Sequence, residues 1–185
     1  MKRKTRKKIL NNRRSLNPDW IREQSGIIAE KLFGLEIFQA ARTVMFYVSR
    51  KSEVNTRGMI KRALSGGWKV AVPVSREEDR RLLPIVIEDP GKELSPGSRG
   101  VLEPEISPGK YLHPRQLDLV ILPGVAFDLE GNRVGRGAAF YDNFLTAVRP
   151  DTGKAALAFE CQLVESITPS RHDVPMDLIV TEKRV

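Results

Sequence analysis

The residues best suited to chemistry lie in one run of the second half of the chain, DLVILPGVAFDLEGNRVGRGAAFYDNFL. Gly135 and Gly137 precede an expected helix, where glycines let the backbone approach a ligand and free N–H groups attract anions. Arg133 and Arg136 add planar guanidinium groups that suit phosphate. Asp142 follows about one turn into that helix, where a carboxylate can hold Mg²⁺ against phosphates. We therefore predict a phosphate site; the alternative is a glycine-rich turn with two solvated arginines and a surface aspartate.

Buried strands must position this run. Continuous apolar segments of strand length are typical of strands that are buried on both faces. They predict strands at residues 43–48, 69–74, 82–87, 117–122, 155–159 and 177–181.

Helices are expected between several of these strands. One begins near Asn17, which can cap it, and extends to about Leu35. Others are expected at 57–64, with Thr56 as a cap, and at 138–148. The alternation predicts the α/β class, with a mainly parallel central sheet that has helices on both faces. Ligands of such sheets bind outside the carboxyl ends of the strands.

Proline and glycine are concentrated in residues 88–116. This composition predicts a long irregular connection. Connections of this length inside a compact domain are usually functional or mobile.

Length and composition limit the class of protein. With 185 residues, of which 41% are hydrophobic and 29% charged, one globular domain over residues 1–185 is expected. No apolar run approaches the roughly 20 residues of a membrane span. The one cysteine, Cys161, excludes an internal disulfide framework, and the two histidines, His113 and His172, leave little for a histidine metal cage. A reducing, cytoplasmic location is the default expectation.

The net charge of +8 lies at the start of the chain. Residues 1–14 hold eight basic side chains and no acidic one, whereas the rest of the chain is neutral. Such a segment suits a polyanion, either a nucleic acid or the triphosphate of a nucleotide. The alternative is a solvated, fraying terminus.

Several motifs, in order, resemble the 5-formyltetrahydrofolate cyclo-ligase family over almost the whole chain. They are a basic start with Lys2 and Arg6, then Ser52-Glu53-Val54, Gly100-Val101-Leu102-Glu103-Pro104, the run Pro123–Leu145, Ala158-Phe159-Glu160-Cys161-Gln162-Leu163, His172-Asp173 and Ile179-Val180-Thr181-Glu182. The Pro123–Leu145 run is the most specific of them.

The resemblance implies an ATP- and Mg²⁺-dependent closure of 5-formyltetrahydrofolate to 5,10-methenyltetrahydrofolate, with release of ADP and phosphate. It also implies a three-layer α/β/α sandwich, similar to sugar-phosphate isomerases and CoA transferases. The partners are then a reduced folate and ATP, with no nucleic acid and no membrane, in a monomer or weak homodimer. Such chemistry asks the protein mainly for positioning and for neutralising charge at phosphate.

The resemblance also implies roles for individual residues. Catalytic positions are Arg133, Arg136 and Tyr141. ATP-binding positions are Lys2, Arg3, Lys4, Thr5, Arg6, Arg133, Val134, Gly135, Arg136, Gly137, Ala138, Ala139, Phe140 and Tyr141. Folate-binding positions are Val48, Glu53, Arg136, Gly137, Ala138, Ala139 and Phe140. The metal ligands are Asp142 and Asp173. Lys2 and Arg6 share one face of a helix, so we expect them to reach the phosphates together, with the other six charges of residues 1–14 mostly solvated.

The chain departs from the family pattern at three positions. Ala139 replaces a glycine: if this position needs a positive φ, alanine costs of order 1 kcal/mol in strain, and if it lies within the helix, alanine is acceptable. Phe140 lacks a hydroxyl that is usual there. Arg99 stands where an aromatic residue often stacks on folate, although an arginine can also stack on a flat ring.

Two alternative functions stay open at this point. The basic start could bind nucleic acid, and such binding would weaken steeply with salt. A diverged relative could instead keep the ATP site and act on another compound. Calorimetry with ATP, and then with 5-formyltetrahydrofolate, separates the three hypotheses.

Overall fold

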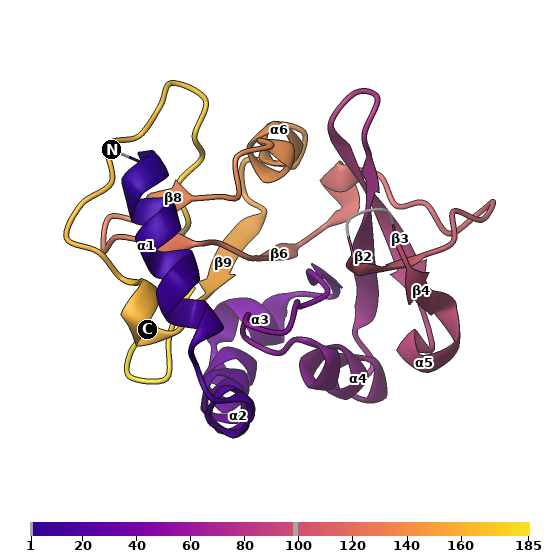
Figure 1. The fold of residues 1–185 in the computed structure, drawn as a ribbon. Coiled ribbons are helices and arrows are strands. Elements are labelled where there is room, and N and C mark those ends of the chain that lie inside the picture. Colours follow the sequence, from indigo (N-terminus) through magenta and orange to yellow (C-terminus); the bar gives the residue numbers. More distant parts are fainter. Residues whose placement is uncertain (1, 98–99) are drawn as a thin grey trace.

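The computed structural model describes residues 2–97 and 100–185, and Arg99 lies outside them. A six-stranded sheet forms the centre of the molecule, in the order β10-β9-β6-β1-β2-β3 (Figure 1). Its strands pair in parallel except β2 with β3, which pair antiparallel. The strands are β1 (Thr43–Met45), β2 (Lys69–Arg76), β3 (Arg81–Ile87), β6 (Leu119–Leu122), β9 (Gly153–Leu157) and β10 (Leu178–Val180).

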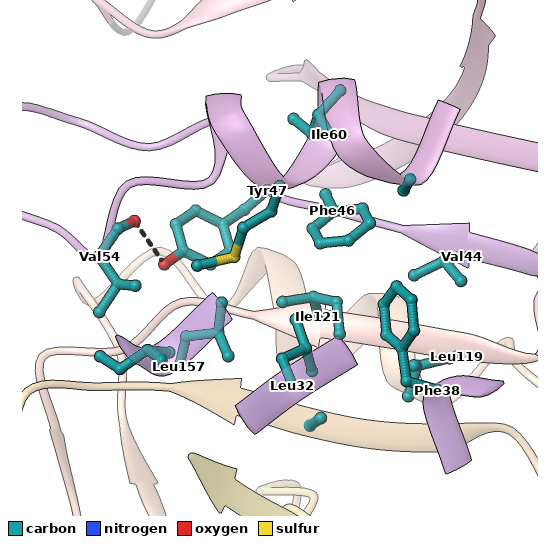
Figure 2. Packing of buried hydrophobic residues seen from close by; sticks show 14 of the residues in the cluster. Leu32, Phe38, Val44, Phe46, Tyr47, Val54, Ile60, Leu119, Ile121 and Leu157 are labelled. Atoms are coloured by element: carbon teal, nitrogen blue, oxygen red, sulfur yellow. Dashed lines mark hydrogen bonds between the residues drawn. The ribbon is translucent and has the colours of Figure 1, made fainter. Parts of the chain in front are cut away.

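Helices cover both faces of this sheet, as the sequence predicted. Alternate strand residues point to opposite faces, so Val44 packs with one apolar cluster and Met45 with another. The first cluster includes side chains of α2 (Pro18–Gly34), α3 (Glu36–Ala40) and α4 (Arg57–Ser65). The second includes side chains of α6 (Phe140–Leu145). Figure 2 shows the first cluster, where the rings of Phe38 and Phe46 lie among aliphatic side chains from the sheet and the helices.

Local sequence explains where the long helix begins. The side chain of Asn17 accepts a hydrogen bond from the N–H of Asp19 (2.7 Å), and Pro18 occupies the first helical position. Thr56 stands at the expected cap position of the next helix, but its side chain makes no capping hydrogen bond. Thr56 precedes α4, but its hydroxyl donates to the carbonyl of Tyr47 (2.6 Å) and accepts from the N–H of Ser49.

Two sequence expectations need correction. The helix expected at 138–148 is shorter, because Ala139 is left-handed (φ 57°) and α6 begins only after it. The connection over 88–116 is not wholly irregular. It holds α5 (Pro90–Glu93), the antiparallel pair β4 (Leu94–Pro96) and β5 (Leu102–Pro104), and the 3₁₀ turn η1 (Pro114–Gln116).

The basic start of the chain is a helix, α1 (Lys2–Arg14). It contacts β7 (Ala126–Phe127), which pairs antiparallel with β8 (Arg133–Val134). It also contacts the 3₁₀ turn η2 (Glu160–Gln162). Figure 1 shows α1 in indigo beside the orange β8 and the yellow C-terminal segment. In the part of the chain that is described, no helix is long and apolar enough to cross a membrane.

Candidate active site

A cavity of about 330 Å³ opens at the carboxyl ends of β1 and β6. Tyr47 and Val48 follow β1 and line it, as do Pro123 and Gly124, which follow β6. From β1 the chain continues to β2 and β3 on one side of the sheet. The later strands β6, β9 and β10 extend the sheet on the other side of β1. Open α/β sheets bind ligands at such a switch point, so the cavity lies where the sheet topology favours a site.

The loop between β8 and α6 forms one wall of this cavity. Gly137 has a φ of 107°, which glycine adopts without strain, and Ala139 has a φ of 57°. The position of Ala139 therefore needs the left-handed conformation, and alanine carries a strain of about 1–2 kcal/mol there. This outcome decides between the two alternatives left open by the sequence.

Arg133 is buried in the wall of the cavity, with only 4% of its side chain exposed. Its Nη2 donates to Oδ1 of Asp142 at 2.6 Å, and its guanidinium carbon lies 5.7 Å from the centre of the Tyr141 ring. Its Nε is buried and has no hydrogen-bond partner within the described structure. A buried donor without an acceptor is costly, so Arg133 Nε is an unsatisfied group in the wall of the cavity.

The N-terminal half of α1 supplies two more cations. Lys2 forms an ion pair with Asp173, and its Nζ lies 3.1 Å from the hydroxyl oxygen of Ser170. Arg6 donates from Nε to the carbonyl of Gly135 at 2.8 Å. Burial raises the pKa of Asp173, but the hydrogen bonds from Lys2 and from the Ser170 N–H outweigh this effect and hold the pKa below its usual value.

Glu53 and Arg136 form the third charged pair of the cavity. Arg136 Nη2 donates to Oε1 of Glu53 at 2.7 Å, and the N–H of Arg50 donates to Oε2 at 3.0 Å. The Glu53 side chain is 8% exposed, whereas that of Arg136 is 42% exposed. Burial raises the pKa of Glu53, but these hydrogen bonds, together with the charges of Arg136 and Arg13, lower it below its usual value.

Most of the residues expected in the site line this one cavity. They are Lys2, Arg6, Val48, Glu53, Arg133, Gly135, Arg136, Gly137, Ala138, Ala139, Phe140, Tyr141, Asp142 and Asp173.

Four expected residues do not line the cavity. Arg3 is exposed to solvent, and Lys4 and Thr5 line a different groove, beside Cys161. Val134 is buried against Ile9 in a small core cluster. The rotation of a helix explains the result for the three residues of α1. Lys2 and Arg6 share one face of the helix, which is turned to the cavity, and the residues between them lie on other faces.

The expectation that the other six charges of α1 are mostly solvated is confirmed, with one exception. Arg13 is 1% exposed, whereas Arg3, Lys4, Lys7, Lys8 and Arg14 are exposed. The sequence carried a signal for this difference. Lys2, Arg6, Ile9 and Arg13 recur at intervals of four, three and four, which places them on one face of a helix.

Sequence reasoning missed ten further residues that line the cavity. They come mostly from the segments directly after strands, or from the strands themselves, and a topology was needed to bring them together. They are Tyr47, Arg50, Pro73, Ser75, Leu82, Val101, Glu103, Pro123, Gly124 and Ser170.

The aromatic residues at the start of α6 serve both core and cavity. Phe140 is 8% exposed and packs with Phe144 and Leu145, yet it also lines the cavity. Burial raises the pKa of Tyr141 well above its usual value, so its phenol stays protonated at neutral pH. Tyr47, across the cavity, donates its hydroxyl hydrogen to the carbonyl of Val54 at 3.0 Å (Figure 2).

The carboxylates of the cavity suit a magnesium ion. Asp142 and Asp173 offer the hard oxygen ligands that Mg²⁺ prefers. Among residues 2–97 and 100–185, no group of three or more acidic, histidine or cysteine side chains forms a complete metal cage. This arrangement fits an ion that is held by one or two carboxylates together with the phosphates of a substrate.

Comparison with known proteins gives a consistent result. The model of the 5-formyltetrahydrofolate cyclo-ligase family matches residues 1–182. The chain is 30% identical to the 5-formyltetrahydrofolate cyclo-ligase of Escherichia coli K12, over 96% of this chain and 98% of that protein. It is 28% identical to the mouse 5-formyltetrahydrofolate cyclo-ligase, over 98% and 93% of the two chains.

Solved structures show the same fold. The structure of Aquifex aeolicus 5,10-methenyltetrahydrofolate synthetase superimposes with a TM-score of 0.86 at 31% identity, over 99% of this chain and 90% of that one. The synthetase from Mycoplasma pneumoniae gives a TM-score of 0.79 at 22% identity, over 98% of both chains. The second likeness bears on the fold alone.

Proposed function

The chain belongs to the 5-formyltetrahydrofolate cyclo-ligase family, and from this membership we propose that it converts 5-formyltetrahydrofolate to 5,10-methenyltetrahydrofolate. The reaction consumes ATP and releases ADP and phosphate. A folate cyclo-ligase must bring a reduced pterin and a triphosphate together. The cavity beside the Gly135–Tyr141 loop is the place that we propose for both.

One observation carries the placement of the reaction. Three cations that converge on the cavity are each paired with a carboxylate, and one of these cations has a buried donor without a partner among the described residues. A triphosphate can take the cations, while a metal ion and the pterin can take the carboxylates. The pairs are Lys2 with Asp173, Arg133 with Asp142, and Arg136 with Glu53.

The proposed chemistry has two steps. The oxygen of the N5-formyl group forms a bond to the γ-phosphorus of ATP, while the bond from that phosphorus to the bridging oxygen of ADP breaks. N10 then forms a bond to the activated formyl carbon, and the bond from this carbon to the phosphate oxygen breaks. The N10 proton and the former formyl oxygen leave with the phosphate, so atoms and charge balance.

The protein contributes position and charge to these steps. We assign Arg133 and Arg136 to the phosphate that is transferred, because guanidinium groups stabilise the charge that develops on its oxygens. Lys2 and Arg6 hold the remaining phosphates from the α1 side. Asp142 and Asp173 would hold Mg²⁺, which neutralises phosphate charge when it is bound. Glu53 accepts hydrogen bonds from donor groups of the pterin.

A spectrophotometric assay tests this function. We expect the absorbance of 5,10-methenyltetrahydrofolate to rise when the protein is mixed with 5-formyltetrahydrofolate, ATP and Mg²⁺, with one ADP formed for each methenyl product. Omission of ATP should abolish the rise. If the folded protein binds ATP but yields no methenyl product, a different substrate must be sought and this function is wrong.

We also propose that the enzyme works in the cytoplasm, as a monomer or weak homodimer. The chain's one cysteine, Cys161, is a free thiol, and free thiols persist in reducing compartments. Cell fractionation, together with sedimentation of the purified protein, tests both statements.

A further inference from the structure

Arg13 is the most deeply buried charge of α1, and the proposed chemistry leaves it without a role. Its Nε donates to the carbonyl of Ser52 at 2.8 Å, and its Nη1 donates to the carbonyl of Gly124 at 3.0 Å. Its Nη2 lies 3.3 Å from the hydroxyl of Ser52 and 3.6 Å from Oε1 of Glu53. A guanidinium presents several donors in one plane, so this one side chain can bind both the Ser52-Glu53 segment and Gly124.

These contacts join three parts of the cavity. The carbonyl of Gly124 follows β6, and Ser52 and Glu53 belong to the segment after β1. The helix that contributes Arg13 also carries Lys2 and Arg6. Arg13 is therefore the point at which the helix on the nucleotide side is fixed to the carboxylate on the folate side.

The carboxylate of Glu53 depends on its cationic neighbours. Arg136 approaches it from the loop before α6, and Arg13 approaches it from α1. The phenols of Tyr47 and Tyr141 are close enough to feel the charge of this carboxylate, and burial raises the pKa of both well above the usual value, so they stay neutral. Arg13 thus supplies a fully buried charge beside Glu53, whereas the side chain of Arg136 is 42% exposed.

We propose that Arg13 is a positioning residue, which holds the Glu53 carboxylate ionised and oriented for the reduced folate. The proposal rests on the function proposed above. When a phosphate draws Arg136 away from Glu53, Arg13 remains as its partner, so the carboxylate need not take up a proton. Arg13 itself touches neither substrate.

The titration of Glu53 tests this role without any substrate. The carboxyl carbon of Glu53 is followed by NMR in the free protein, in Arg13→Gln and in Arg14→Gln. Arg14→Gln removes the same charge from the adjacent, exposed position. We expect the midpoint of Glu53 to rise in Arg13→Gln and to stay unchanged in Arg14→Gln, because a nearby cation favours the ionised form. An unchanged midpoint in folded Arg13→Gln overturns the proposal.

Kinetics give the second test, with Arg13→Lys as a variant that keeps the charge and should fold. We expect its Michaelis constant for 5-formyltetrahydrofolate to rise about tenfold, since the fork of hydrogen bonds is lost, while that for ATP changes by less than about threefold. Equal rises for both substrates would show a general loss of structure and overturn the role.

A double-mutant cycle tests whether Arg13 acts through Glu53. In a Glu53→Gln background, Arg13→Gln should weaken folate binding much less than it does alone, because coupled residues are not additive. Additive losses would overturn the proposal. If the unaltered protein makes no methenyl product, the proposed function fails, whereas the Glu53 titration still decides whether Arg13 controls this carboxylate.

Discussion

Arg133 combines burial, an ion pair and an Nε without a partner among the described residues, and its replacement by lysine separates charge from geometry. We expect Arg133→Lys to weaken ATP binding by about 1.5–3 kcal/mol, or roughly 10- to 200-fold, because lysine keeps the charge near Asp142 but lacks the planar fork. Calorimetric titration with ATP measures the change. Arg62→Lys is the matched control, since Arg62 pairs with Glu30 on the exposed surface of α4. Equal ATP affinities in the two variants would contradict the assignment.

Asp142 is expected to act through its negative charge, which attracts a cation, and not through its contribution to the packing of the fold. In Asp142→Asn the amide oxygen can still accept the hydrogen bond from Arg133, so the fold should be preserved. The variant should need a higher Mg²⁺ concentration for half-maximal turnover and should bind folate unchanged, because the amide lacks the charge that attracts the ion. Turnover measured across a Mg²⁺ titration checks this, with the exposed Asp151→Asn as control. An unaltered Mg²⁺ dependence in Asp142→Asn would remove this residue from the metal site.

Ala139 is a non-glycine residue with a left-handed backbone. Ala139→Gly should relieve about 1–2 kcal/mol of strain, less about 0.4–1 kcal/mol from the greater freedom of glycine in the unfolded chain. We therefore expect a net gain of up to about 1.5 kcal/mol, measured by urea unfolding. Ala29→Gly, in the middle of α2, should change stability by a similar amount in the opposite direction. A loss of stability in Ala139→Gly would show that the alanine methyl group makes compensating contacts.

Helix α1 carries its functional and its solvated charges on different faces. Lys2 and Arg6 reach the cavity, whereas Lys4 and Lys8 line the groove beside Cys161. We expect Lys2→Ala/Arg6→Ala to raise the Michaelis constant for ATP at least tenfold and to leave thermal stability without ligand nearly unchanged. Lys4→Ala/Lys8→Ala removes the same charge from the same helix and should keep the original ATP dependence.

The same pair of variants tests the nucleic-acid alternative. An arm that binds phosphate backbones through net charge would lose salt-sensitive DNA or RNA binding equally in both double variants. An arm that is part of the active site would show a difference in ATP kinetics only. If both variants keep the ATP dependence of the unaltered protein, α1 is not part of the site.

At the level of helices and strands, the sequence predicted the buried strands of the central sheet. It did not predict where the chain leaves a strand in order to line the cavity. The apolar runs located all six strands of the central sheet to within a few residues. The run expected at 43–48 ends as a strand at Met45, because Tyr47 and the residues after it leave the sheet to line the cavity. Hydrogen bonds among Tyr47, Ser49 and Thr56 replace the strand ladder there. Propensity carries no information about such a departure.

The glycine loop was predictable, and the residues opposite it were not. Arg133, Arg136 and Asp142 stand close in sequence, so their types and spacing suffice to indicate a phosphate site. Ser75 and Glu103 join them only because β2 and the loop that carries β5 meet at the carboxyl edge of the sheet, where the N–H of Ser75 donates to Glu103. Contacts of this kind require the topology of the whole sheet.

The carboxylate of Asp118 joins segments of the molecule that are distant in the sequence. Oδ2 of Asp118 accepts hydrogen bonds from the N–H groups of Arg42 and Thr43, both at 3.0 Å, and Oδ1 pairs with Arg149. Burial raises the pKa of Asp118, but these partners outweigh that effect and lower the pKa below its usual value. The pKa of the folded state is thus below that of the unfolded state. The stabilisation is present above the unfolded pKa and is lost as the pH falls through the folded pKa.

We therefore expect the free energy of unfolding to fall steeply below about pH 4. Between about pH 5 and 7 the contribution of Asp118 to this free energy should vary little. Asp118→Asn should be less stable at neutral pH and should lose less stability on acidification. Urea unfolding at a series of pH values measures both, with the exposed Glu105→Gln as control. The same acid dependence in Asp118→Asn as in the unaltered protein would contradict this origin.

Lys2 and Asp173 are bonded although 171 positions separate them in the chain. At a synthesis rate of roughly 5–20 residues per second, α1 leaves the ribosome about 10–35 seconds before its partner exists. The end of α1 that carries Lys2 must wait through nearly the whole of translation, although Ser52 and Gly124, the partners of Arg13, are made earlier, and the strands from β1 to β9 are already available to pair. A nascent chain that stalls before residue 173 can therefore hold most of its sheet and still lack the partner that fixes the Lys2 end of α1 at the site.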